Sequence, residues 1–195
     1  MAKILIACEY SGTVRDAFIG GGHEAMSCDL LPTDSPGAHY QGDIRDVLDY
    51  PWDLMIAHPP CTHLSVSGAA HFKAKRLEGK QQSAVSFFMM LAKLDIPMIA
   101  IENPVCVMSS LYRKPNQIIQ PYMFGHYETK ATCLWLKNLP ELTATDDVKD
   151  ETMALPENKR MRLHYLSPSP TRAKERSKTF QGVADAMAAQ WGSLL

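Results

Sequence analysis

The sequence has no long hydrophobic run, almost no net charge and no internal repeat. Its most apolar stretch, residues 85–92, is far too short to cross a bilayer, so we expect no membrane-spanning segment. The net charge of -1 over 195 residues argues against binding duplex DNA through one large basic face, although it leaves room for a local basic patch. The hydrophobic fraction of 46% and the charged fraction of 21% exclude a disordered or fibrous protein.

Paired cysteine motifs are also missing. The cysteines are odd in number, spread along the chain and without any C-x-x-C pair, which favours reduced thiols over a disulfide framework. The chain begins with a strand-like segment and shows no cleavable apolar region. We therefore expect a cytoplasmic enzyme or binding domain. The cysteines are Cys8, Cys28, Cys61, Cys106 and Cys133.

Short apolar runs alternate with helical patterns along the chain. Strands are predicted at residues 3–8, 24–28, 53–57, 98–101 and 132–136, and helices at residues 13–19, 83–94 and 182–191. This alternation predicts an α/β fold, with a Rossmann-like, open and mostly parallel sheet covered by helices on both faces. The length suits one catalytic or binding domain over residues 1–195. Residues 140–170 are polar and rich in proline, and they are predicted to form a surface excursion.

Polar or reactive groups follow four of the predicted strands: residues 9–12, Asp29, residues 60–61 and residues 102–104. Ligands of such sheets bind in the crevice beyond the carboxyl ends of the strands. Each group alone is better explained as a turn or a cap. Four together indicate a binding site.

The first two groups, residues 9–12 and Asp29, are typical of a site that binds a nucleoside-containing cofactor. Gly12 opens a helix whose backbone N–H groups suit an anionic or polar ligand group. Asp29 lies where a carboxylate usually holds two ribose hydroxyls. Asp43 is then placed to accept a hydrogen bond from an adenine amino group. It is equally well explained as a turn residue after Gly42.

Residues 58–65 read His-Pro-Pro-Cys-Thr-His-Leu-Ser. Two prolines hold Cys61 on a stiff loop, where a helix start or a cation that lowered the pKa of its thiol would make it a nucleophile. A zinc site built from His58, Cys61 and His63 is a second interpretation, ranked lower because no fourth ligand has a confirming spacing. Glu102 follows an apolar strand, and partial desolvation is expected to raise its pKa toward the range of a general acid.

These motifs, in this order, resemble the S-adenosylmethionine-dependent cytosine C5 methyltransferases. Residues 60–65 look like that family's Pro-Cys-Gln-x-Phe-Ser nucleophile loop, and residues 102–104 look like its Glu-Asn-Val. Residues 10–12 resemble its aromatic-Ser-Gly cofactor loop, and residues 179–184 are similar, more loosely, to its last motif. More closely, the chain resembles small phage-type members described as DNA cytosine methyltransferases.

The sequence also departs from this family. Thr62 stands where the family has Gln, Leu64 where it has Phe, and Pro104 where it has Val. No Gln-x-Arg-x-Arg motif follows, and Lys130 either fills part of its role or is an ordinary surface lysine. The family's large target-recognition domain is missing, and only residues 140–170 are available in its place.

The resemblance implies methyl transfer from S-adenosylmethionine to C5 of cytosine, with the thiolate of Cys61 adding to C6 while Glu102 protonates N3. The implied catalytic residues are Cys61, Glu102 and Asn103. The implied cofactor-binding residues are Glu9, Tyr10, Ser11, Gly12, Asp29, Asp43 and Pro60. The implied substrate-binding residues are Ser65, Lys130, Arg172 and Arg176. No metal is implied. DNA is the favoured partner, followed by a cytosine nucleotide, and a protein partner or a homodimer is left open.

Two alternatives stand beside this interpretation. In the first, the chain is a nucleic-acid-binding module without catalysis. In the second, it is an enzyme of the same chemistry that acts on single-stranded nucleic acid, RNA or a free nucleotide. Any nucleic-acid binding is predicted to be weak and salt-sensitive, because it depends on a few basic residues. These are Lys159, Arg160, Arg162, Arg172, Lys174, Arg176 and Lys178.

Overall fold

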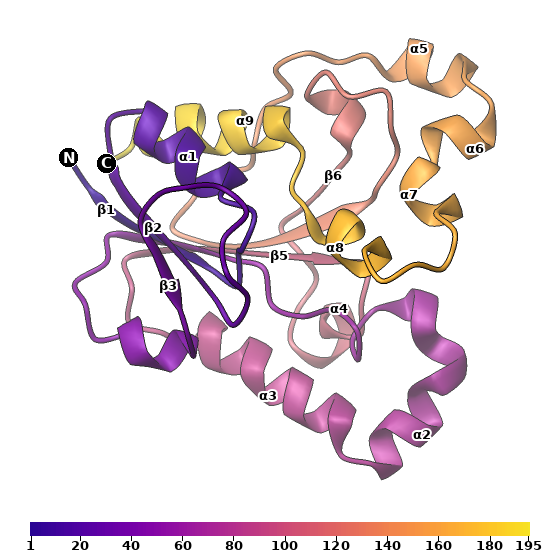
Figure 1. The fold of residues 1–195 in the computed structure, drawn as a ribbon, viewed down its shortest axis with the longest axis horizontal. Helices are drawn as coiled ribbons and strands as arrows, with labels where there is room; N and C mark the ends of the chain where they lie inside the picture. The colour runs from indigo at the N-terminus through magenta and orange to yellow at the C-terminus, as the bar shows by residue number, and fades with distance from the viewer.

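A computed structural model describes residues 1–195, and its centre is a seven-stranded sheet in the order β3-β2-β1-β4-β5-β7-β6 (Figure 1). The strands from β3 to β5 are parallel to their neighbours, whereas β7 is antiparallel to both β5 and β6. The strands are β1 Lys3–Ala7, β2 Glu24–Asp29, β3 His39–Gln41, β4 Leu54–Ala57, β5 Met98–Pro104, β6 Gln117–Ile119 and β7 Thr132–Lys137. The predicted Rossmann-like, mostly parallel α/β fold is confirmed.

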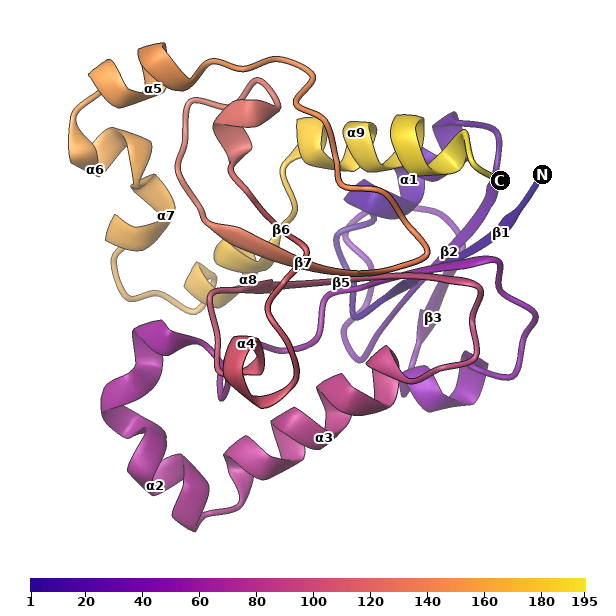
Figure 2. The same ribbon diagram turned by 180° about the vertical axis from the view of Figure 1, so that it is seen from behind.

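Helices cover both faces of this sheet, as predicted. Helices α1 and α9 lie over one face and α3 crosses the other (Figures 1 and 2). The α-helices are α1 Thr13–Gly20, α2 Phe72–Leu77, α3 Lys80–Ala92, α4 Met108–Leu111, α5 Lys149–Ala154, α6 Glu157–Arg160, α7 Arg162–Tyr165, α8 Arg172–Ser177 and α9 Gln181–Gly192. Three 3-10 helices, η1 Ile44–Val47, η2 Val66–His71 and η3 Pro121–Met123, lie in the connections. No helix is long and apolar enough to span a membrane.

The alternating side chains of β1 explain why the molecule has two cores. Ile4 and Ile6 pack into the cluster that contains α1 and α9. Leu5 and Ala7 pack into the cluster under α3. Successive side chains of a strand point to opposite faces, so a continuous apolar run is what a sheet buried on both sides requires.

Strand β5 is longer than the sequence predicts. Glu102 and Asn103 belong to the strand itself, because β7 pairs with it in antiparallel register as far as Pro104. They were expected in a loop after the strand. The run of apolar residues ends at Ile101. The sequence pattern therefore cannot show that β7 continues to pair with β5 beyond that residue.

The excursion at residues 140–170 is folded rather than an open loop. It carries the short helices α5, α6 and α7, and Leu142, Thr152 and Leu163 are buried in it. Figure 1 shows these helices beyond the end of the sheet, with α8 returning from them toward β5.

Candidate active site

Three central strands end level with one another, which brings distant residues together. Ala7 of β1 pairs with Ala57 of β4, and Ala57 pairs with Ile101 of β5. The residues that follow these three are therefore neighbours. They are Cys8, His58 and Glu102. The strand order also reverses between β1 and β4, and open α/β sheets bind their ligands at such a switch point.

Glu102 is paired with a histidine. His58 Nδ1 lies 3.0 Å from Glu102 Oε2, and the two side chains are only 8% and 14% exposed. Burial raises the pKa of Glu102, but the His58 hydrogen bond and the positive charge of Lys130 outweigh it, so the pKa lies below its ordinary value. The expectation of a raised pKa is wrong, because the sequence pattern indicated burial and not the partner. Glu102 is ionised at neutral pH.

Cys61 sits on a turn that is fixed to β5. Its carbonyl oxygen accepts hydrogen bonds from the backbone N–H groups of Leu64 and Ser65, at 3.0 and 2.9 Å. Asn103 Nδ2 donates to the carbonyl oxygen of Pro59 at 2.7 Å, and Asn103 is buried. The turn with the thiol and the strand with Glu102 are therefore held together by a buried hydrogen bond.

The surroundings of Cys61 do not activate its thiol. Burial and the negative charge of Glu102 raise the pKa of the Cys61 thiol, and the positive charges of Lys130 and Arg176 lower it less. The condition for activation, a pKa lowered by a helix start or a cation, is not met. The favoured state at neutral pH is a protonated Cys61 beside an ionised Glu102.

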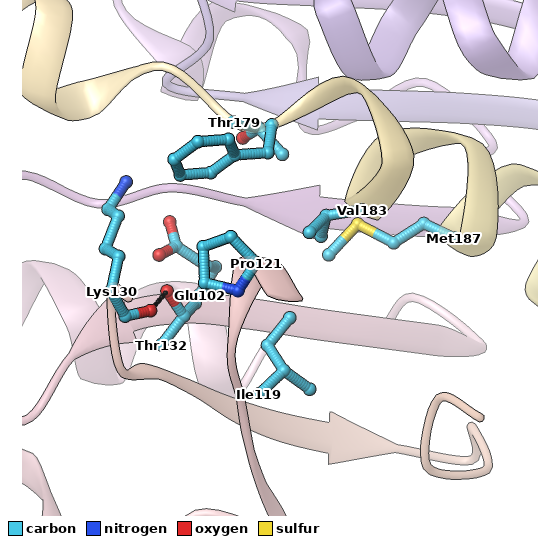
Figure 3. Close-up of a pocket in the computed structure, with 9 residues that line it drawn as sticks. Glu102, Ile119, Pro121, Lys130, Thr132, Thr179, Val183 and Met187 are labelled. Atoms are coloured by element: carbon cyan, nitrogen blue, oxygen red, sulfur yellow. Dashed lines mark hydrogen bonds between the residues drawn. The ribbon is translucent and has the colours of Figure 1, made fainter. Parts of the chain in front are cut away.

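Lys130 lines the same pocket as Glu102, together with Thr179 and Phe180. Figure 3 shows Lys130 and Glu102 side by side, both extending toward the segment that carries Thr179. Lys130 Nζ donates to the carbonyl oxygen of Lys178 at 3.4 Å and lies 5.9 Å from the centre of the Phe180 ring. The pocket measures about 20 Å³, which is room for one water molecule.

The N-terminus of α1 is already capped by a side chain of the chain itself. Glu9 is buried and accepts hydrogen bonds from Ser11 Oγ at 3.0 Å, Val14 N at 2.7 Å and Arg15 N at 3.3 Å. The helix N–H groups that were expected to serve a ligand serve Glu9 instead. Ser11 and Glu9 thus shape the loop, while Gly12 takes the left-handed conformation with a φ of 78°.

Tyr10 is covered by α8. Its hydroxyl group donates to the carbonyl oxygen of Lys174 at 2.5 Å, and Lys174 Nζ lies 4.9 Å from the centre of its ring. Asp34 pairs with Lys174 at 2.5 Å and with Lys178 at 2.9 Å. These two lysines, which are predicted to contact nucleic acid, connect α8 to the loop after β2.

The two candidate cofactor carboxylates lie near the end of β1. Burial raises the pKa of Cys8 to about 12, and the negative charges of Asp29 and Asp43 add to this shift. Asp29 Oδ1 accepts from Leu31 N at 2.9 Å, and its Oδ2 makes no hydrogen bond. Asp43 begins η1 and uses both oxygens on Arg45, one on its backbone N–H and one on its guanidinium group. Of its two interpretations, the turn residue matches these contacts.

A larger cavity of about 400 Å³ lies between the Cys61 loop and the N-terminal part of α3. Of the predicted cofactor residues, only Pro60 lines it. The lining residues are Pro60, His63, Glu78, Gly79, Lys80, Ser83, Ala84 and Phe87.

The remaining predicted substrate residues are only partly brought together. Ser65 begins η2 and its hydroxyl group accepts from Ser67 N at 3.4 Å. Arg172 donates to the carbonyl oxygen of His164 at 3.3 Å. Arg176 is close enough to Cys61 for its charge to lower the thiol pKa. The structure thus joins Lys130 and Arg176 to the Cys61 site, and it gives Ser65 and Arg172 local contacts.

Arg15 was missed by the sequence analysis. Its side chain is fully buried and donates to Ser27, Thr33 and the carbonyl oxygens of Ser35 and Pro36. It therefore anchors the loop after β2. The sequence held one indication of this burial, because Arg15 follows Val14 in a helix that was predicted to have an apolar face.

Close packing around this arginine depends on two glycines. A Cβ atom at Gly12 would lie 2.6 Å from an Arg15 guanidinium nitrogen, and one at Gly37 would lie 2.8 Å from Arg15 Cζ.

The zinc interpretation finds no support in the structure. No group of three or more His, Cys, Asp or Glu side chains is placed to hold a metal ion. His58 is paired with Glu102. All five cysteines are free.

Comparison with solved structures places the fold among those of methyltransferases. A methyltransferase of Entamoeba histolytica aligns with 87% of this chain at a TM-score of 0.52 and 12% identity. A protein described as a DNA modification methyltransferase encoded within an E. coli prophage aligns with 80% of the chain (TM-score 0.46, 13% identity), and the S. pombe Dnmt2 methyltransferase with 99% (TM-score 0.44, 14% identity).

The chain spans 61%, 56% and 66% of the length of these three proteins, respectively. No protein-family model and no curated protein matches the sequence. The alignment with the E. histolytica methyltransferase shows a methyltransferase-like α/β fold, as the sequence motifs implied.

Proposed function

We propose that the protein is an S-adenosylmethionine-dependent methyltransferase that acts on C5 of cytosine, with DNA as the favoured substrate. One observation carries the proposal: a buried hydrogen bond from Asn103 holds the turn of Cys61 against the strand that carries Glu102, and Lys130 lines the pocket beside Glu102. A thiol, a carboxyl group and a cation are the groups that addition to a pyrimidine ring requires.

The cofactor fits the ends of β1 and β2 in part. Asp29 is half-buried and has a free carboxylate oxygen, which suits a ribose hydroxyl. Glu9 and Asp43 are occupied by protein donors, so we assign them to shaping the site. S-adenosylmethionine, when bound, supplies an electrophilic methyl group. Tyr10 lies under α8, so this helix bounds the site on one side.

The proton balance of the addition step follows from the states of Cys61 and Glu102. The thiol loses its proton as sulfur bonds to C6, and N3 of the ring gains one as the ring electrons move to it. Since Glu102 is ionised at rest, it takes up the proton that the Cys61 thiol loses and gives it to N3. C5 then gains the methyl group that the bound cofactor would supply. When the C5 proton afterwards leaves to a base, the C5–C6 double bond re-forms, sulfur departs and N3 returns its proton to Glu102.

Lys130 favours the charged forms of Cys61 and Glu102. Its positive charge lowers the pKa of the Cys61 thiol and of the Glu102 carboxyl group. A base within duplex DNA must be flipped out to reach such a site. The pocket beside Glu102 has a free volume of only about 20 Å³, so we expect α8 or the loop before β7 to move when a base binds there.

The test uses labelled S-adenosylmethionine with duplex DNA, single-stranded DNA, RNA and dCMP. Substrate carrying 5-fluorocytosine should trap a covalent adduct on Cys61, because fluorine cannot leave as a proton. Cys61→Ser should abolish both transfer and adduct, whereas Cys28→Ser should retain them. Methylation by Cys61→Ser, or no transfer to any cytosine substrate, would overturn the proposal.

A non-catalytic nucleic-acid-binding module is the second candidate. The raised pKa of the Cys61 thiol favours it, because a thiol that stays protonated is a poor nucleophile. Nucleic-acid binding without methyl transfer by the wild-type protein would select this candidate.

A further inference from the structure

His58 has no role in the chemistry described so far, although it lies at the centre of the site. It follows β4 directly, its side chain is more than nine-tenths buried, and its Nδ1 lies 3.0 Å from Glu102 Oε2. Its other ring nitrogen, Nε2, is also buried and has no hydrogen-bond partner. Glu102 Oε1, in contrast, makes no hydrogen bond within the protein and belongs to a side chain that lines the pocket.

The contacts indicate which ring nitrogen carries the proton. An imidazolium ion would place an N–H group at Nε2 in a buried position without an acceptor, which is destabilising. A neutral ring protonated on Nδ1 satisfies its donor on Glu102 and leaves only a lone pair at Nε2. We therefore assign the neutral tautomer in which Nδ1–H donates to the carboxylate.

We propose that His58 is a positioning residue for the reaction: its Nδ1–H holds Oε2 of Glu102 and leaves Oε1 as the oxygen that meets the N3 edge of the base. This inference deepens the proposed function and rests on it. His58 touches neither substrate nor cofactor in this scheme, and it acts through Glu102. Without the donor, the carboxyl group is free to rotate between orientations, and the productive one is populated less often.

Two groups interact electrostatically with Glu102 besides His58: Cys61, on the turn after β4, and Lys130, before β7. Arg176, on α8, acts on Cys61. Lys130 lowers the pKa of Glu102 independently of His58. Any change in the titration of Glu102 must therefore be measured with Lys130 and Arg176 left intact.

Two variants of His58 with side chains of similar size separate the effect of its hydrogen-bond donor from the effect of the space that its ring fills. His58→Asn keeps an N–H donor near the position of Nδ1, whereas His58→Leu fills the space without a donor. If the hydrogen bond is what matters, the asparagine variant behaves like the wild type and the leucine variant does not. If His58 only fills space, both variants behave alike.

The first measurement does not depend on activity. With glutamate labelled at its side-chain carboxyl carbon, NMR follows the titration of Glu102, whose signal is assigned by its loss in Glu102→Gln. We expect the titration midpoint to rise in His58→Leu, because a donor to the ionised form is lost, and to stay near the wild-type value in His58→Asn. An unchanged midpoint in His58→Leu would overturn the inference.

The second measurement is methyl transfer across a range of pH. We expect kcat of His58→Leu to fall about 10-fold to 100-fold with a small change in KM, because a misplaced carboxyl group affects the transition state. His58→Asn should recover most of this loss. Wild-type kcat in His58→Leu would overturn the inference. Absence of transfer in the wild type would overturn the proposed function instead, and the NMR titration would still decide whether His58 controls Glu102.

Discussion

Asn103 donates a hydrogen bond from its buried side-chain amide to the carbonyl oxygen of Pro59, 44 residues earlier in the chain. The bond joins the strand that carries Glu102 to the turn that carries Cys61. The same amide group also donates to the carbonyl oxygen of Glu102 at 3.0 Å, whereas Asn103 Oδ1 has no partner. The spacing of the two reactive groups therefore depends on a third residue.

Replacing Asn103 with alanine should lower both stability and activity. The Pro59 carbonyl loses its donor, which costs about 1–3 kcal/mol in the free energy of unfolding. The Cys61 turn also loses its connection to β5, so methyl transfer and the 5-fluorocytosine adduct should decrease. Urea denaturation and the labelled-methyl assay measure the two effects.

Asn138→Gly is the matched control. Asn138 also donates to a proline carbonyl, that of Pro97, but at an exposed site and with a φ of 55° that glycine accepts readily. Its loss should cost much less and leave methyl transfer intact. An equal loss of activity in the two variants would contradict the role given to Asn103.

The reactivity of Cys61 should respond in opposite directions to its two charged neighbours. Because Glu102 raises the pKa of the thiol and Lys130 lowers it, Glu102→Gln should speed alkylation by iodoacetamide at a fixed pH near 8 (about the value at which a free thiol ionises), and Lys130→Ala should slow it. For the wild type, the rate should keep rising above the pH at which a free thiol is half-ionised. Peptide mapping by mass spectrometry gives the rate at each cysteine.

The other thiols provide an internal control for this experiment. Burial raises the pKa of Cys8 to about 12 and those of Cys28 and Cys133 to about 11. They should stay unmodified near pH 8. If both variants changed the rate at Cys61 in the same direction, the charges would not control the thiol.

The contact of α8 with the loop after β2 should weaken in acid. Hydrogen bonds from Lys174 and Lys178 hold the pKa of Asp34 below its ordinary value. A carboxyl group with a lowered pKa stabilises the folded state above its ordinary pKa of about 3.9, and this contribution is lost as the pH falls through the lowered value. Each exposed pair contributes only about 0.2–1 kcal/mol, so α8 should loosen without global unfolding.

Asp34→Asn should loosen α8 already at neutral pH. Hydrogen exchange and tryptic cleavage near Lys174 and Lys178 should both become faster. Glu78→Gln, which removes the separate surface pair with Lys80, should leave α8 unchanged. If exchange in α8 were the same in Asp34→Asn and the wild type, Asp34 would not hold this helix.

Arg15→Lys should be more harmful than the conservative change suggests. Lysine keeps the charge but cannot reach the several acceptors that the guanidinium group contacts, so the carbonyl oxygens of Ser35 and Pro36 lose their donor. We expect a loss of about 2–3 kcal/mol in the free energy of unfolding and weaker binding of S-adenosylmethionine by calorimetry. Arg45→Lys, at an exposed site, is the control and should cost little. Equal stability of Arg15→Lys and the wild type would show that the buried contacts are dispensable.

The sequence by itself determined the layered fold and the end of the sheet at which the site lies. Apolar runs such as residues 3–7 require burial on both faces, and that requirement leads to a parallel sheet with helices on each side. Polar groups directly after those runs can lie only at the carboxyl edge. Local pattern is sufficient for both conclusions, because each depends on residues adjacent in the chain.

Tertiary structure decided the state of each group in the site. Glu102 is ionised because His58 lies beside it across two paired strands, and the α1 N-terminus is closed because Glu9 folds back onto it. Lys174, a candidate for nucleic-acid contact, also pairs with Asp34, which lies 140 residues away in the sequence. Burial alone raises a carboxyl pKa, whereas a nearby donor or cation lowers it, and the balance depends on distances that only strand register and loop packing set.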